Sequence, residues 1–233
     1  MRNRRAFAVT VATCAALIVP SLSGCFGARP APPPRDADEP TRQSLAPTEV
    51  REYEGRDLSS IDEFRENSIA GPQHVDEAAY RLTVDGLVAR PLSLTYDDIL
   101  GQPTYEKVVT LHCVEGWSVD ILWEGVLIGD LLAEATPDSA ATIVIFRAAD
   151  GYSTSLPLSY LLENDILLAY RMNGVELPAE RGFPFQLVAE ERWGYKWVKW
   201  VTEIELSDDA TFRGYWESRG YSNSGARDES FRE

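Results

Sequence analysis

Short runs of apolar residues, separated by turn residues, fill the part of the chain after residue 80, and they predict mostly strands. Residues 108–113 carry β-branched valine and threonine, which is typical of a buried central strand, and Gly116 and Gly125 then predict turns. The dipeptides Asp85-Gly86, Asp150-Gly151 and Asn173-Gly174 each predict a hairpin. The other predicted strands are residues 80–84, 87–88, 141–146, 152–156, 166–172, 175–177, 185–190 and 200–206.

Helical periodicity is confined to a few short segments. Residues 126–135 predict an amphipathic helix, and residues 95–100 and 158–163 predict one or two helical turns. Many short strands with few helices predict an α+β fold, dominated by one mixed sheet. The chain lacks GxGxxG and GxxxxGK[ST] motifs, which removes the usual nucleotide-binding alternatives.

The first 24 residues have the pattern of an export signal. A basic start is followed by an apolar run over residues 6–19, which is shorter than a membrane-spanning helix requires. Leu22-Ser23-Gly24-Cys25 resembles a bacterial lipobox, which implies cleavage before Cys25 and lipidation of its thiol. The alternative is an ordinary signal peptide with an incidental cysteine. Arg4-Arg5 resembles a twin-arginine motif, and that route (Tat export) carries folded proteins.

Residues 25–58 are rich in proline and charge, with almost no apolar periodicity. This composition predicts a tether that holds the rest of the chain away from a membrane surface. Residues 59–233 are long enough to form one domain with a sizeable core.

The charge balance narrows the set of partners. The chain carries a net charge of −15 with 37 acidic residues, which argues against nucleic acid and anionic lipid as ligands. Lysine is scarce, and Lys196 and Lys199 lie close together in the motif GYKWVKW. We therefore expect these lysines to have a function beyond solvation.

Cys113, at the end of the central strand, is the candidate reactive residue. A thiolate can bind a soft metal or act as a nucleophile, while a buried thiol can also be a plain core residue. The chain has no CxxC, CxxCH or HExxH motif, and His74 and His112 are its histidines, so a metal here needs a cofactor to supply further ligands. His112 is disfavoured as a base for Cys113, because adjacent strand residues face opposite sides.

The segment LHCVEGWSVDILWEGVLIGDLL resembles the metal-ligand region of the sulfite oxidase fold family of molybdopterin-binding oxidoreductases. Within that family it is most similar to the branch of periplasmic methionine-sulfoxide reductase catalytic subunits. FRENSIAGPQHVD, YRLTVDGLV, RGFPFQLVAEERWGYKWVKWVTEIEL and GYWESRGYSN extend the resemblance over most of residues 60–225. It implies the family's fold and a molybdenum-molybdopterin cofactor whose metal is bound by Cys113.

The resemblance also implies a set of cofactor contacts. Asn67 matches an asparagine that hydrogen-bonds the pterin, and Lys199 matches the most characteristic lysine of the turn around its phosphate. Arg181 and Gln186 depart from the family pattern, because the positive charge has moved between these two positions. The cofactor-binding residues implied in this way are Asn67, Ala70, Gly71, Cys113, Arg181, Gln186, Lys196, Trp197, Val198 and Lys199.

Oxygen-atom transfer is the activity that the resemblance implies, with Glu115 as the candidate for orienting groups or handling protons. We expect Trp117, Trp193 and Tyr195 to wall the cleft. An acidic residue so close to Cys113 repels sulfite, which favours a small neutral S-oxide or N-oxide substrate. A sulfite-oxidising enzyme of the same fold is one alternative, and a metal-free lipoprotein that binds or scaffolds is another.

Electrons must come from or go to a separate protein, because the chain has no haem motif. A membrane haem subunit or a cytochrome is the expected partner. The export signal and lipobox together predict a protein anchored by lipid on the outer face of the cytoplasmic membrane, in the periplasm or at the cell surface.

Overall fold

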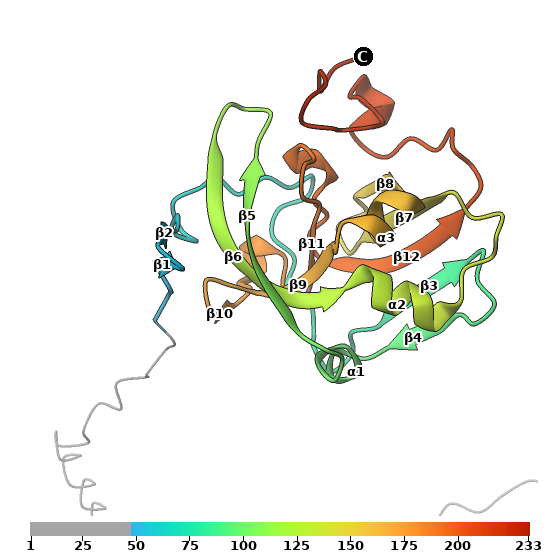
Figure 1. Cartoon of the computed structure of the whole chain (residues 1–233), viewed down its shortest axis with the longest axis horizontal. Coiled ribbons are helices and arrows are strands. Elements are labelled where there is room, and N and C mark those ends of the chain that lie inside the picture. The colour runs from blue at the N-terminus through green and yellow to red at the C-terminus, as the bar shows by residue number, and fades with distance from the viewer. Residues whose placement is uncertain (1–47) are drawn as a thin grey trace, which may run out of the picture. The chain divides into compact units, whose positions relative to one another are not determined.

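The computed structural model describes residues 48–233, which form two five-stranded β-sheets and one two-stranded sheet, with short helices beside them (Figure 1). The predicted export signal, Cys25 and most of the predicted tether lie outside these residues. Over residues 48–233, helices are too short or too polar to cross a lipid bilayer. The predicted α+β fold, with strands dominant, is confirmed.

The first five-stranded sheet has the order β10-β9-β6-β5, with β11 also paired to β9. All of its pairs are antiparallel. Strands β5 and β6 form a long hairpin that is registered from Tyr105 opposite Gly125 to His112 opposite Ser118. The strands are β5 (Tyr105–His112), β6 (Ser118–Leu127), β9 (Leu167–Met172), β10 (Val175–Glu176) and β11 (Gln186–Val188).

The second five-stranded sheet has the order β4-β3-β12-β7-β8. It is mixed, because β12 runs parallel to β3 while the other pairs are antiparallel. The strands are β3 (Leu82–Gly86), β4 (Leu92–Leu94), β7 (Ile143–Ala148), β8 (Ser153–Pro157) and β12 (Val201–Ser207). The predicted single sheet is therefore divided in two, and β11 and β12 belong to different sheets.

Short helices connect and cover the strands. Helix α1 (Tyr96–Leu100) begins with a capping box, in which the Thr95 hydroxyl and the Asp98 carboxylate each bond the other's backbone N–H. Helix α2 (Ile128–Ala135) buries one apolar face in the core, as its predicted amphipathic pattern requires. The remaining helical segments are α3 (Leu158–Glu163), η1 (Ala179–Arg181), η2 (Gly194–Lys196) and η3 (Glu217–Arg219).

Strand β6 was not predicted, and it ends with residues that the sequence assigned to a turn, at Gly125, and to the start of a helix, at 126–127. Gly125 lies inside β6, next to an irregularity in its pairing with β9. Helix α2 begins only at Ile128, after the strand ends at Leu127. The apolar residues that suggested an early helix start are instead buried in the sheet.

The predicted hairpin at Asp85-Gly86 is wrong. Gly86 has a φ of +78°, and a Cβ atom there would lie 2.2 Å from the backbone oxygen of Leu206. The glycine therefore permits close approach of the parallel strand β12, and β3 pairs with β4 only after a longer connection. The hairpins at Asp150-Gly151 and Asn173-Gly174 are confirmed by the β7–β8 and β9–β10 pairs.

The folded part of the chain begins before residue 59, inside the predicted tether. Strands β1 (Glu52–Tyr53) and β2 (Arg56–Asp57) pair, and Leu58 is buried. The Glu49 carboxylate accepts hydrogen bonds from the Asn173 amide (2.9 Å) and from the backbone N–H of Ile61 (2.7 Å). The polar composition of this segment suggested a tether, but Glu49 forms hydrogen bonds with the folded domain.

Candidate functional site

Cys113 is the first residue of the tight loop that joins β5 to β6. Its backbone N–H donates to the oxygen of Trp117 (2.9 Å), and its own oxygen accepts from the N–H of Gly116 (3.1 Å). This loop closes the hairpin and fixes the thiol at the end of the strand. The Cys113 side chain is buried, and burial raises the pKa of the thiol.

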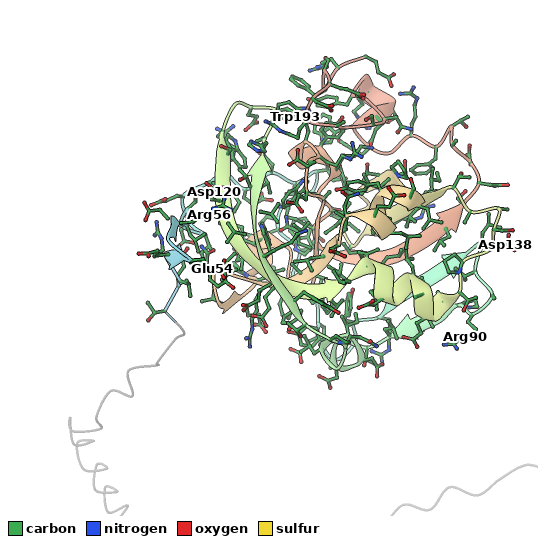
Figure 2. The ribbon with its side chains drawn as sticks, in the orientation of Figure 1. Glu54, Arg56, Arg90, Asp120, Asp138 and Trp193 are labelled. Carbon is green, nitrogen blue, oxygen red and sulfur yellow. The ribbon has the colours of Figure 1, made fainter. Side chains whose placement is uncertain are left out.

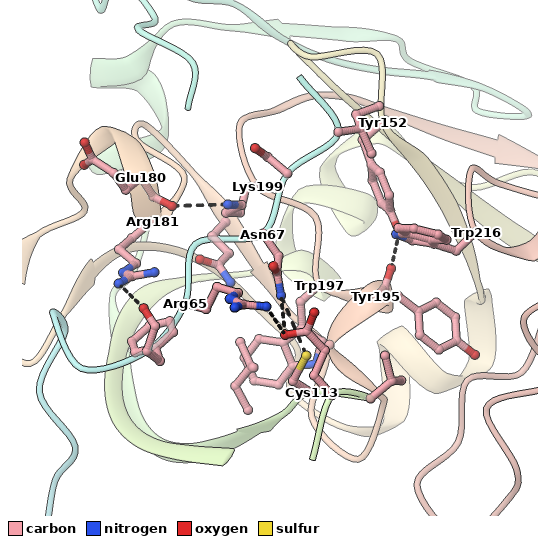
Figure 3. A pocket seen from close by; sticks show the side chains of 18 of the residues that line it. Arg65, Asn67, Cys113, Tyr152, Glu180, Arg181, Tyr195, Trp197, Lys199 and Trp216 are labelled. Carbon is pink, nitrogen blue, oxygen red and sulfur yellow. Dashed lines mark hydrogen bonds and ion pairs between the residues drawn. The ribbon is translucent and has the colours of Figure 1, made fainter. Parts of the chain in front are cut away.

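The thiol lines a cavity of about 270 Å³ between the two sheets' connecting loops (Figure 3). Segments far apart in the sequence meet here: the loop before β3, the β5–β6 loop, the β7–β8 turn, the segments around η1 and η2, and the C-terminal segment (residues 217–233). Seven of the predicted site residues are brought together in the lining. They are Asn67, Cys113, Glu115, Arg181, Gln186, Trp197 and Lys199.

Four predicted cofactor residues do not line this cavity: Ala70, Gly71, Lys196 and Val198. Val198 is fully buried in the hydrophobic core. Lys196 is also fully buried, and its ammonium bonds the Glu217 carboxylate (2.6 Å) and the backbone oxygen of Ser155 (3.0 Å). The Lys196 ammonium is therefore occupied by partners outside the cavity lining.

Asn67 connects the thiol to the neighbouring carboxylate. Its amide donates to Cys113 Sγ (3.8 Å) and to Glu115 Oε2 (3.5 Å). The indole N–H of Trp117 also donates to Glu115 Oε2 (3.2 Å), and Arg65 lies 3.5 Å from the same oxygen. The hydrogen bond from Trp117, followed by those from Asn67 and Arg65, lowers the pKa of Glu115 below its usual range. Glu115 is therefore an ionised acceptor at neutral pH.

Cationic groups occupy one side of the cavity. Arg181 donates to the backbone oxygens of Ile61 (2.9 Å) and Phe64 (2.7 Å), so it also fixes the loop that carries Asn67. Lys199 pairs with the Glu66 carboxylate and donates to the backbone oxygen of Glu180 (3.2 Å). Burial lowers the pKa of both cations.

Aromatic residues line both sides of the cavity, and Phe64 and Trp200 lie against Arg181 (3.8 Å) and Lys199 (4.4 Å). Figure 3 shows Tyr195 and Trp216 across Cys113 from Arg181 and Lys199. The Tyr152 hydroxyl donates to the backbone oxygen of Tyr195 and so joins the β7–β8 hairpin to η2. Of the three residues predicted to wall the cleft, Trp117 and Tyr195 line the cavity.

Trp193, the third predicted wall residue, does not line the cavity. It lies beside the C-terminal segment (Figure 2), where its ring packs edge-on against Phe231 with centroids 5.6 Å apart. Its backbone N–H donates to the oxygen of Gly225 (2.9 Å). Trp193 therefore holds the C-terminal segment in place rather than contacting a ligand.

Sequence reasoning missed several lining residues that come from distant segments. The missed residues are Phe64, Arg65, Ser68, Ile69, Leu111, Val114, Asp150, Tyr152, Glu180, Gly194, Trp200, Trp216 and Tyr221. Arg65 lies within the FRENSIAGPQHVD block, and Trp216 and Tyr221 lie within GYWESRGYSN, so both blocks marked the right regions. Periodicity alone does not reveal which loops converge on the same cavity.

His112 faces away from the Cys113 cavity. It lines a separate, polar cavity with Arg56 and Glu190, whereas Cys113 lines the main one. Burial is the main cause that lowers the pKa of His112, and the positive charge of Arg227 lowers it further. The arrangement does not support His112 as a general base for the thiol.

The donor set matches a metal that is held mainly by a cofactor. Within residues 48–233, no three His, Cys, Asp or Glu side chains gather in a way that could hold a metal ion. Cys113 offers one soft ligand, and Asn67, Arg181 and Lys199 offer donors for the polar edge and phosphate of an organic group. These residues fit a cofactor that brings the metal's remaining ligands.

Comparison with known proteins identifies such a cofactor. Residues 69–216 match the family model for the oxidoreductase molybdopterin binding domain. The chain is 37% identical over 151 residues to the uncharacterized oxidoreductase YuiH of Bacillus subtilis, covering 64% of this chain and 76% of YuiH. It is 29% identical over 228 residues to the protein-methionine-sulfoxide reductase catalytic subunit MsrP of Xanthomonas campestris, covering 88% of this chain and 70% of MsrP.

A solved structure shares the fold. The sulfane dehydrogenase SoxCD of Paracoccus pantotrophus superposes with a TM-score of 0.58 at 28% identity, over 60% of this chain and 41% of that chain. The fold and family that the sequence predicted are thus confirmed, as is the cofactor. The chain belongs to the oxidoreductase molybdopterin binding domain family and is a molybdenum-molybdopterin oxidoreductase.

Proposed function

We propose that this enzyme transfers oxygen atoms and reduces a small, neutral S-oxide or N-oxide. For an S-oxide the balanced reaction is R₂SO with two electrons and two protons, giving R₂S and water. When bound, the molybdenum group supplies the two-electron oxygen-transfer chemistry. The chain's own residues hold that group, orient the substrate and deliver protons.

The observation that carries this proposal is the charge balance around Cys113. The cavity lining contains Arg65, Arg181 and Lys199, but also Glu115, Asp150 and Glu180. Glu115 lies within two residues of the thiol, and its hydrogen bonds keep it ionised. A sulfite anion would meet this carboxylate, whereas a neutral S-oxide would not be repelled. The relative MsrP is named as a protein-methionine-sulfoxide reductase, in agreement with this substrate class.

Individual residues then have distinct proposed roles. Cys113 binds the metal as a thiolate, and Asn67 holds both the sulfur and Glu115 in position. Lys199 and Arg181 supply positive charge for the cofactor's phosphate, with Gln186 and Trp197 beside them. Glu115, held ionised by its hydrogen bonds, is placed to accept a hydrogen bond from the water or protonated group that delivers protons during turnover.

The test is to purify the enzyme from a host that makes molybdopterin and to measure turnover with three substrates. Reduced viologen dye serves as electron donor for dimethyl sulfoxide and trimethylamine N-oxide, and ferricyanide as acceptor for sulfite. We expect reduction of an S-oxide or N-oxide, no sulfite oxidation, and loss of turnover in Cys113→Ser. Sulfite oxidation without S-oxide or N-oxide reduction would support the sulfite-oxidising alternative instead.

The cellular setting is part of the proposal. We infer an exported enzyme that is anchored by lipid at Cys25 after twin-arginine export, and that receives electrons from a membrane haem subunit or a cytochrome. MsrP is named as a catalytic subunit, which agrees with a separate electron-transfer partner. Cys25→Ser should release the protein from membranes without changing its turnover with viologen dye. An unchanged membrane association in this variant would contradict the anchor.

A further inference from the structure

The last residues of the chain extend beyond the shared family domain and still contribute to the cavity. The family match ends at Trp216. Tyr221, further along, lines the cavity together with Trp216, and the centroids of the two rings are 5.1 Å apart. Tyr221 also packs edge-on against Tyr195, another lining residue, at 5.1 Å. The aromatic side of the site therefore depends on a segment outside the matched domain.

Residues 217–233, here called the C-terminal segment, are fixed at their start by a buried ion pair. Glu217 is 1% exposed, and its carboxylate accepts from the Lys196 ammonium (2.6 Å) and from the Thr154 hydroxyl. Lys196 belongs to η2, next to the lining residue Tyr195. The start of the C-terminal segment is therefore tied to the cavity wall itself.

Backbone contacts fix the segment further along. The Tyr195 hydroxyl donates to the oxygen of Ser222 (2.7 Å), directly after Tyr221. Gly225 has a φ of +62°, and a Cβ atom there would lie 2.5 Å from Lys196 Cγ, so the segment lies directly on the lysine side chain. With both sides of Tyr221 attached, its ring has a defined place in the cavity wall.

A cavity wall made of aromatic rings favours ligands with aromatic or apolar groups. Rings pack favourably against other rings and against apolar groups, beyond the effect of the area they bury. The cations lie on the other side of Cys113 in Figure 3, where a phosphate fits. The rings of Tyr195, Trp216 and Tyr221 offer such a surface to the substituents of a substrate whose oxygen is directed toward Cys113.

We propose that Tyr221 is a specificity-determining residue, which makes this enzyme prefer S-oxides with an aryl or large apolar substituent over dimethyl sulfoxide. This inference rests on the proposed function and names its substrate class. One added ring contact gives a preference of up to about tenfold.

Binding of sulfones tests the inference on the cofactor-loaded enzyme without turnover. Methyl phenyl sulfone and dimethyl sulfone are stand-ins that lack a reducible S-oxide, and titration calorimetry gives the Kd of each. We expect wild type to bind the phenyl compound about tenfold more tightly, and Tyr221→Ala to lose most of that ratio. Tyr221→Phe keeps the ring and should keep the ratio.

Tyr215 provides the matched control. Its ring packs on Trp216 (5.3 Å) and Tyr152 (5.8 Å) in the same aromatic cluster, but it does not line the cavity. Tyr215→Ala should therefore keep the binding ratio. An unchanged ratio in Tyr221→Ala, or an equal loss in Tyr215→Ala, would overturn the inference.

Two further measurements separate a failure of the Tyr221 inference from misfolding of the variant and from a failure of the proposed function. If Tyr221→Ala does not fold, Tyr221→Leu removes the ring while keeping an apolar side chain, and the same loss of ratio is expected. Dimethyl sulfoxide turnover is measured separately. Failure to reduce any S-oxide or N-oxide would reject the proposed function, whereas the sulfone ratio decides on Tyr221 in either case.

Discussion

Lys196 and Lys199 lie in one short motif, yet the structure places them in regions with opposite properties. Lys199 lines the cavity, retains 15% side-chain exposure and shares its charge with Glu66. Lys196 is fully buried behind the cavity wall and is matched by an equally buried Glu217. The sequence resemblance assigned both to the cofactor phosphate.

The difference shows that a cation's role depends on its partner and its exposure. A cation that binds a ligand must be partly exposed to the cavity and must be able to interact with the ligand and its protein partner together, as Lys199 can. A charge enclosed with one carboxylate is committed to that pair, because separating the two would leave a charge in the protein interior. We therefore assign Lys199 to ligand binding and Lys196 to holding the C-terminal segment.

The largest expected effect is on stability. Lys196→Met leaves the Glu217 carboxylate buried without its cation, which should cost about 3–5 kcal/mol of unfolding free energy. Urea denaturation of the purified variant measures this loss. The matched variant Lys199→Met should lose much less stability, because that side chain reaches the cavity. Equal losses in the two variants would remove the distinction between the two regions.

The second largest effect is expected on turnover, when the Glu115 carboxylate beside Cys113 is removed. Glu115→Gln keeps the shape and an acceptor for Trp117 but removes the charge and the proton site. We expect kcat for S-oxide reduction to fall by roughly 10²-fold, in line with typical general acid–base contributions. Steady-state kinetics with viologen dye measures the effect, and molybdenum content serves as the control. A kcat equal to wild type in fully loaded Glu115→Gln would exclude a proton role.

A smaller effect is expected for cofactor retention in Lys199→Met. Removing one charge-assisted contact to the phosphate should weaken pterin binding by about tenfold or more. Release of pterin during dialysis, followed by its fluorescence after oxidation, measures retention. Lys107→Met, at a lysine outside the cavity lining, is the control and should retain the cofactor as wild type does.

The smallest predicted effect concerns pH. Burial lowers the pKa of Lys199, so its ammonium loses its charge at a lower pH than an exposed lysine would. Because the charged form is the one that binds phosphate, retention of the pterin should weaken as the pH rises. Arginine remains charged throughout this range, so Lys199→Arg should show a flatter pH profile. Identical profiles for the two proteins would show that Lys199 does not contact the phosphate.

Local sequence signals predicted those elements whose structure depends only on residues close by in the sequence. The short helix at residues 95–100 and the Asn173-Gly174 and Asp150-Gly151 turns depend on neighbouring residues only, and they formed as predicted. Gly86 failed as a turn signal because its role is set by a distant strand, β12. Strand β6 was hidden by apolar residues that fit either a strand or a helix.

The site was predictable to the extent that residues lie near a recognisable motif. Cys113, Glu115 and Asn67 lie together in the structure, because the β5–β6 loop and one neighbouring segment carry them. Lys196 and Tyr221 were not predictable, since their positions depend on a C-terminal segment that folds back over η2. Whether a lysine in this motif faces the cavity or is buried behind it depends on how distant segments pack.

The central claim, that Cys113 binds a molybdenum cofactor in this cavity, is tested most directly by metal content. Protein from a molybdopterin-producing host is analysed by mass spectrometry for molybdenum and pterin, comparing wild type, Cys113→Ser and Cys25→Ser. The account predicts near-stoichiometric molybdenum in wild type and Cys25→Ser, and its loss in Cys113→Ser. Wild-type protein that contains no molybdenum, or a fully loaded and active Cys113→Ser variant, would contradict it.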